Sequence, residues 1–198
     1  MNDNDSIIAN GVFIQDVNGK LWNTEDWDDS VSPNAVAVIS KKCRFLIALH
    51  DVVGQEKRIA DNTMEALEKM MATFKWRFNA KRDYDGKGNT ENLFVTIPYV
   101  SHYAVGACKS WEFPNGKAEG YVPSLGQLWI AYRNRDFINA ALIKCHGDAM
   151  HDSYYWSSTF CGIYDDKRRC CWAFGWKNGF AYQALLFFNN CVRPFADL

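Results

Sequence analysis

The C-terminal stretch from Tyr154 to Phe195 constrains the fold of this chain more than any other part of the sequence. Within it, Trp172, Phe174 and Trp176 occupy every second position. Alternate residues of a β-strand point to the same face of a sheet, so these three rings share one face and the two small residues between them point the other way. We therefore expect a strand with one scaffold face and one free face.

Large apolar residues also fill the segments around this strand, and no regular period explains their positions. They are mixed with charged and amide side chains, a composition that differs from that of a buried core. We therefore expect these segments to face solvent. The apolar members are Phe160, Ile163, Tyr164, Phe180, Tyr182, Leu185, Leu186, Phe187 and Phe188, and the polar ones are Asp165, Asp166, Arg168, Arg169, Asn189 and Asn190.

At these residues the sequence resembles a known family. The run YWSST, the tryptophan strand, the glycine of KNG and the closing VRPF are similar to the C-terminus of the C-type-lectin-fold variable proteins that retroelements diversify in gut bacteria and their phages. The similarity extends upstream through Asp83 to Thr90, Gly120 to Leu128 and Asn134 to Leu142. It is strong over residues 83–198 and looser before them.

The resemblance implies an α+β fold of the C-type lectin kind, with helices packed on antiparallel β-sheet. A chain of 198 residues with 48% hydrophobic content can build one sizeable core, so we expect a single domain over residues 1–198. Its first 60 residues are β-rich, and residues 154–195 would form the variable region. The order of strands, then helices, then strands agrees with this class.

The resemblance also implies that variable residues lie on one exposed surface, held by a fixed scaffold. Aromatic and arginine side chains on such a surface have the composition of an interface hot spot. We expect the ligand-binding set to be Phe160, Cys161, Gly162, Ile163, Tyr164, Asp165, Arg168, Arg169, Ala173, Gly175, Phe180, Tyr182, Ala184, Leu185, Phe187, Phe188 and Asn189. We expect the scaffold to be Trp156, Trp172, Phe174, Trp176, Gly179, Val192 and Phe195.

The function that follows is the binding of a macromolecular ligand, a host-surface protein or a glycan-bearing receptor, for phage or cell-surface attachment. The N-terminus has no signal-peptide pattern, which favours a virion part over a cell-surface protein. A net charge of −1 and a pI near 6.4 give no electrostatic footprint for nucleic acid, and no apolar run is long enough to insert in a membrane. The apolar surface could equally join subunits of a homo-oligomer.

Two alternatives to a diversified binding protein stay open. A virion or adhesion component with a fixed partner would have the same fold. Formylglycine-generating oxidases also share the fold and use a cysteine pair with copper, but their catalytic pattern is not found around Cys170 and Cys171. Neighbouring arginines would lower the thiol pKa there, although inert surface residues are the preferred interpretation. We expect no enzymatic activity and no cofactor.

Candidate metal sites are equally weak. Seven cysteines without a CxxC pair argue against a disulfide framework and a zinc site, and the spacing of Cys145, His146 and His151 is not that of zinc ligands. Asp83 and Asp85 hint at a calcium loop, but Phe94 stands where a glutamate is required, so a turn and helix cap is favoured. The Glu-Pro-Asn and Trp-Asn-Asp triplets of calcium-dependent sugar receptors are absent. We expect no metal.

Three local patterns predict secondary structure. Ala35 to Ile39 and Arg44 to Leu49 read as a β-hairpin. Ser124 and Gln127 form a capping box at the start of a helix. Apolar residues at spacings of three and four predict an amphipathic helix that packs on the core, through Met64, Leu67, Met71, Phe74 and Phe78.

Overall fold

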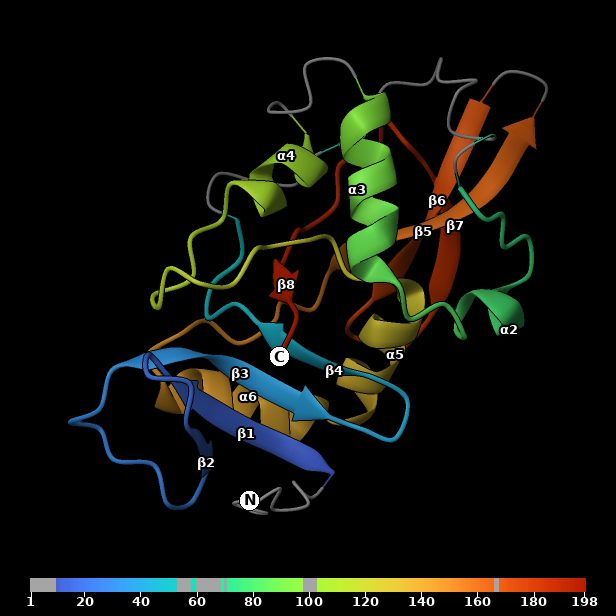
Figure 1. Cartoon of the computed structure of the whole chain (residues 1–198). Coiled ribbons are helices and arrows are strands. Elements are labelled where there is room, and N and C mark those ends of the chain that lie inside the picture. The colour runs from blue at the N-terminus through green and yellow to red at the C-terminus, as the bar shows by residue number, and fades with distance from the viewer. Residues whose placement is uncertain (1–9, 53–57, 60–68, 70, 98–102, 166–167) are drawn as a thin grey trace, which may run out of the picture.

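Two antiparallel sheets, with helices beside and between them, make up the architecture of the chain (Figure 1). The structure is a computed structural model that describes residues 10–52, 58–59, 69, 71–97, 103–165 and 168–198. Alternating strand patterns at both ends of the sequence and capped helices between them produce this arrangement. The chain is therefore of the α+β class, as the sequence predicts.

The first sheet has the strand order β2-β1-β3-β4-β8. Its hairpin of β3 and β4 is the one predicted from the sequence, and the Ser40 hydroxyl accepts hydrogen bonds from the backbone N–H groups of Lys42 and Cys43 in the turn. The C-terminus returns to pair with β4. The strands are β1 (Gly11–Asp16), β2 (Leu21–Asn23), β3 (Pro33–Ile39), β4 (Arg44–Ile47) and β8 (Phe195–Ala196).

The second sheet has the order β5-β6-β7 and contains the tryptophan strand. Its strands are β5 (Tyr154–Asp165), β6 (Arg168–Gly175) and β7 (Ala181–Leu185). Tyr155 pairs with Phe174 and Trp172 pairs with Gln183, so the register of β6 is fixed on both sides. The register of β5 shifts near Phe160, where the alternation of its side chains is broken.

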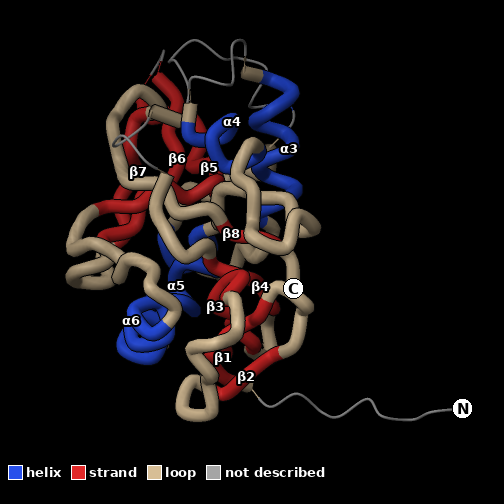
Figure 2. Tube along the Cα trace, turned by 90° about the vertical axis from the view of Figure 1, so that its left-hand side faces the viewer, coloured by secondary structure: helices blue, strands red, loops and turns tan. Residues whose placement is uncertain are grey.

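Helices α5 (Leu125–Arg133) and α6 (Arg135–Lys144) connect the two sheets. Helix α6 contacts β1 and β3, whereas α5 contacts β5 and β6 (Figure 2). The predicted capping box at the start of α5 is confirmed. The backbone N–H of Gln127 donates to the Ser124 hydroxyl at 3.4 Å, and the side-chain oxygen of Gln127 accepts a hydrogen bond from the backbone N–H of Ser124 at 2.9 Å.

Helices α3 (Gly86–Thr96) and α4 (Ala104–Lys109) lie on the other side of the second sheet. The Asp85 carboxylate accepts the Gly88 N–H at 2.8 Å at the start of α3, which confirms the helix-cap interpretation of this segment. The Asp83 carboxylate accepts hydrogen bonds from Asn89 and Thr159 at 2.7 and 2.6 Å.

The helix predicted over Met64 to Phe78 is wrong over residues 71–76, whereas Lys69 is helical. Residues 71–76 form no helix, α2 covers only Arg77–Ala80, and Phe78 is exposed; Met64 and Leu67 lie outside the described residues. The backbone N–H of Phe74 binds the carbonyl of Phe160 at 2.9 Å, so this segment is held in an irregular path by the second sheet. Tertiary hydrogen bonds here override a spacing that resembles helical periodicity.

Candidate ligand-binding surface

The face of the second sheet that carries Trp172 and Phe174 is closed by α5. The ring of Tyr132 lies 5.4 Å from that of Phe174 and 5.9 Å from that of Trp176. These residues belong to a core cluster that also contains Val36 of β3 and Ile138 of α6. One side of the tryptophan strand is therefore a structural core shared by both sheets.

The opposite face is also covered over most of its area, so the expectation of a free face at Ala173 is wrong. Trp156, Cys171 and Ala173 pack in a second core cluster, which includes Leu93 of α3 and Val105 of α4. Small residues on β6 and β7 leave room for the rings of β5 and for the helices above them. The sequence shows which residues share a face, but not that a second layer lies on that face.

Burial divides the predicted ligand-binding residues into three groups. The buried group cannot meet a partner without a change of structure and corrects our expectation; it comprises Phe160, Cys161, Gly162, Arg169, Ala173, Gly175, Ala184 and Leu185. The half-buried group comprises Arg168, Tyr182 and Phe187. The exposed group comprises Ile163, Tyr164, Asp165, Phe180, Phe188 and Asn189.

The predicted scaffold residues lie inside the protein, with one exception. The buried ones are Trp156, Trp172, Phe174, Trp176, Val192 and Phe195. Gly179 is half-buried and has a positive φ of 67°, and a Cβ atom there would lie 2.6 Å from the Tyr132 ring. Only glycine fits this turn between β6 and β7.

Cys161, Cys170 and Cys171 are buried, which corrects the interpretation of Cys170 and Cys171 as surface residues. Cys161 and Cys170 form a disulfide between β5 and β6, with their Cα atoms 5.4 Å apart, although the sequence argued against a disulfide framework. Burial raises the pKa of the Cys171 thiol above its ordinary value, with Asp83 adding to the shift. The thiolate form that a reactive cysteine needs is therefore disfavoured at this position.

Ile163, Tyr164 and Phe188 gather where β5 and β6 reach the end of the sheet near Arg168, whereas the exposed Phe180 precedes β7 at the opposite end. Tyr164 is 53% exposed and Ile163 lies beside it on β5. Phe188 follows the end of β7 and stacks edge to face on Phe187, with 5.1 Å between ring centroids. Since the Leu186 N–H binds the Arg169 carbonyl, the two segments lie at the same end of the sheet. We call Ile163, Tyr164, Asp165, Arg168, Phe187, Phe188 and Asn189 the hairpin-end surface.

A charged pair fixes part of the hairpin-end surface. The Arg168 guanidinium donates a hydrogen bond to the Asp165 carboxylate at 2.6 Å, and its carbon lies 5.6 Å from the Tyr164 ring centroid. This hydrogen bond raises the pKa of Arg168. The pair gives the hairpin a defined polar edge beside its apolar residues, an arrangement typical of binding interfaces.

A second exposed group lies on and beside α2, where Arg77 contacts Phe180 toward the other end of the sheet, and most of its members were not predicted from the sequence. The segment from Phe74 to Lys75 crosses all three strands. The backbone N–H of Phe74 donates to the carbonyl of Phe160 on β5 at 2.9 Å, and the indole N–H of Trp172 on β6 donates to the carbonyl of Phe74 at 2.8 Å. The side-chain amide of Gln183 on β7 donates to the carbonyl of Lys75 at 2.9 Å. Trp76 and Phe78 then stand out from α2, 74% and 67% exposed. The sequence signal for this exposed group is the run KWRFNAKR at residues 75–82, in which cations and aromatic rings alternate at the start.

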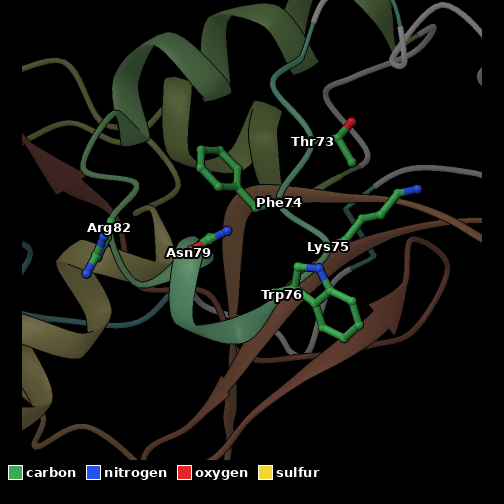
Figure 3. A pocket seen from close by; sticks show the side chains of 6 residues that line it. All are labelled: Thr73, Phe74, Lys75, Trp76, Asn79 and Arg82. Atoms are coloured by element: carbon green, nitrogen blue, oxygen red, sulfur yellow. The ribbon is translucent and has the colours of Figure 1, made fainter.

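A pocket of about 520 Å³ lies along this segment (Figure 3). The view shows Trp76 pointing away from Phe74 and from Arg82, so the lining residues project in several directions. Its lining residues are Thr73, Phe74, Lys75, Trp76, Asn79 and Arg82. The volume falls within the range of small-ligand sites and suits one or two amino-acid side chains.

Other groups of polar residues have structural partners. The Ser157 hydroxyl accepts the Thr159 N–H at 3.0 Å and the Ser158 hydroxyl donates to Gly86 O at 3.4 Å, as expected for scaffold residues. Burial raises the pKa of Cys145 to about 12. Within the described ranges, no three His, Cys, Asp or Glu residues are grouped as metal ligands would be.

Comparisons with protein families, with curated proteins and with solved structures find no match to this chain. Among the described residues, no helix has the length and apolar character needed to cross a membrane. The candidate surface is therefore assigned from its own residues and their geometry, and not from a related protein.

Proposed function

We propose that this chain is a ligand-binding protein with a C-type lectin fold, of the kind that retroelements diversify, and that it attaches a phage or a cell to a macromolecular ligand. The α+β architecture and the resemblance over residues 83–198 support the proposal. The observation that carries it is the hairpin-end surface, where apolar and charged side chains stand exposed on a sheet whose two faces are largely packed.

The hairpin-end surface has enough apolar area for recognition. Each large side chain that a partner removes from water contributes about 1.5–3 kcal/mol before the costs of ordering are subtracted. Ile163 and Tyr164 are exposed at the end of β5, and Phe188 is exposed in the turn that follows β7. A partner that covers these three residues would gain useful affinity without a rearrangement of the protein.

Diversification can be tested in the genome that encodes the chain. A nearby reverse transcriptase and an imperfect repeat of the coding stretch for Tyr154 to Phe195 are expected. The substitutions between the two repeats should fall on codons of the hairpin-end surface and leave Phe160, Ala173 and Ala184 unchanged, because these three are buried. Differences concentrated on buried positions would contradict the proposed surface.

A virion or adhesion component with a fixed partner is the second candidate. The same exposed residues favour it, since a constant surface can bind equally well. The locus separates the two: a lone gene without a repeat or a reverse transcriptase would identify the fixed-partner protein.

A further inference from the structure

The strongest unassigned feature is a cluster of exposed cations and aromatic rings on and beside α2. We call it the α2 patch; it comprises Lys75, Trp76, Arg77, Phe78, Lys81 and Arg82. Within the described part of the chain, no carboxylate lies within 4 Å of the charged groups of these four cations. The nearest acid in sequence, Asp83, is buried and bonded to Asn89 and Thr159.

The guanidinium groups of the two arginines of the patch lie over aromatic rings. The guanidinium carbon of Arg82 lies 4.3 Å from the Phe78 ring centroid, and that of Arg77 lies 5.0 Å from the ring of Phe180. An aromatic ring offers a guanidinium no carboxylate or carbonyl oxygen, so the N–H groups of both arginines can pair with the carboxylates of a ligand. The rings thus hold two planar donors in position before any ligand arrives.

Lysines add to the positive character of the patch. The Lys81 ammonium lies 3.3 Å from the Trp129 ring centroid, and burial, assisted by the charge of Arg77, lowers its pKa. The positive charges of Arg77, Lys81 and Arg82 lie close together on this face and favour an incoming negative group. Lys75 stands at the edge of the pocket that Phe74 and Trp76 line. A ligand that carries negative charge beside an apolar side chain would therefore complement the α2 patch.

We propose that the α2 patch binds an acidic protein segment. Carboxylates of the segment pair with Arg77 and Arg82, and one of its aromatic or aliphatic side chains enters the pocket against Phe74 and Trp76. Nucleic acid is disfavoured because the chain carries a net charge of −1 and the unpaired cations are confined to eight residues. The patch is separate from the hairpin-end surface, so this binding site is additional to the proposed function.

A labelled random copolymer of glutamate and tyrosine is the probe that tests this site. The wild-type chain should bind it saturably and more tightly than polyglutamate of equal charge. The double variant Arg77→Ser/Arg82→Ser should weaken copolymer binding by about tenfold or more, since two charge-assisted hydrogen bonds are lost. Trp76→Ser should remove the preference for the copolymer over polyglutamate. The control Arg44→Ser, an exposed arginine on β4, should leave binding unchanged.

Several results would overturn the inference. These are the absence of saturable copolymer binding, equal affinity in the double variant and the wild type, or the same loss in Arg44→Ser. Tighter binding of single-stranded oligothymidylate than of the copolymer would show a nucleic-acid surface instead. None of these results bears on the hairpin-end surface, because the arginine variants lie at the other end of the sheet.

Discussion

Arg193 shows at the residue scale how the C-terminus is fixed. Its guanidinium is buried and forms an ion pair with Asp51, and it donates to the carbonyls of Ala48 and Asp148 at 3.0 and 3.1 Å. The Tyr155 hydroxyl donates to the same Asp51 carboxylate at 2.9 Å. One side chain of the closing VRPF motif therefore joins β5, the segment after β4 and the residues after α6.

Replacement of Arg193 should be strongly destabilising. Arg193→Met would take the buried guanidinium from the Asp51 carboxylate, which would keep only Tyr155 and His151 as partners, and would remove the donors to the carbonyls of Ala48 and Asp148. Loss of one partner of a buried ion pair costs about 3–5 kcal/mol. Urea unfolding should show this loss, while Arg44→Met on the exposed side of β4 should change the free energy of unfolding by less than about 0.5 kcal/mol. A loss below about 1 kcal/mol in Arg193→Met would contradict the role of the pair.

Asp16 gives a prediction for the pH dependence of stability. Burial alone would raise the pKa of its carboxyl, but hydrogen bonds from Trp22, Lys20 and Asn18 outweigh burial and lower it. A lowered folded-state pKa stabilises the protein above the unfolded value of about 3.9, and this contribution is lost as the pH falls through the folded value.

The variant Asp16→Asn tests this linkage. It should lower the free energy of unfolding by about 1–2 kcal/mol at neutral pH. Because the wild-type carboxyl becomes protonated in acid, the difference between the two proteins should shrink below about pH 4. Thermal unfolding from pH 2 to 7 measures it, and a difference that stays constant or grows in acid would refute the assignment.

At the element scale, α5 is placed by the close approach of its first turn to the segment before α3. The Gly126 N–H binds the Asp83 carbonyl at 2.9 Å, and a Cβ atom at Gly126 would lie only 2.2 Å from that oxygen. The Ser124 hydroxyl donates to the same carbonyl at 2.8 Å. Glycine at this position therefore permits the contact that positions Trp129 and Tyr132 under the second sheet.

Gly126→Ala should be destabilising although alanine favours helices. Relief of the overlap requires a shift of α5, which costs about 1–3 kcal/mol and exceeds the gain of up to about 1 kcal/mol in helix propensity. Denaturant unfolding of the variant measures the balance. Glu91→Ala, at an exposed position of α3, is the control and should stay within about 0.5 kcal/mol of the wild type. A stabilised Gly126→Ala would show that the overlap is relieved at no cost.

Elements governed by local interactions were predictable from the sequence, and elements governed by tertiary contacts were not. The capping box at Ser124 and the hairpin of β3 and β4 depend on neighbouring residues, and both are confirmed. The segment around Phe74 has helical spacing, but hydrogen bonds to β5 and β6 hold it in another path. The spacing of apolar residues shows a helical period, but the hydrogen-bond partner of each backbone group depends on how the whole chain folds.

At the scale of the whole molecule, the second sheet is enclosed on two sides and exposes side chains at its ends. The pairing of faces in β6 was predictable from alternation, since Trp172 and Phe174 do share one side. The covering of Ala173 was not, because it depends on α3 and α4, which are remote in sequence. The candidate site is therefore smaller than the sequence suggests. The α2 patch adds a surface that contains Phe78, which the sequence placed on the core-facing side of an amphipathic helix.

The hairpin-end surface is the proposed ligand-binding site of the whole molecule. Arrays of host-surface proteins and glycans would identify a ligand for the wild-type chain, and the triple variant Ile163→Ser/Tyr164→Ser/Phe188→Ser should bind it at least about a hundredfold more weakly at an unchanged melting temperature. The control triple variant Val95→Ser/Phe137→Ser/Ile143→Ser removes exposed apolar residues of α3 and α6 and should bind like the wild type. Equal binding by the wild type and the hairpin-end variant would show that the ligand binds elsewhere on the protein.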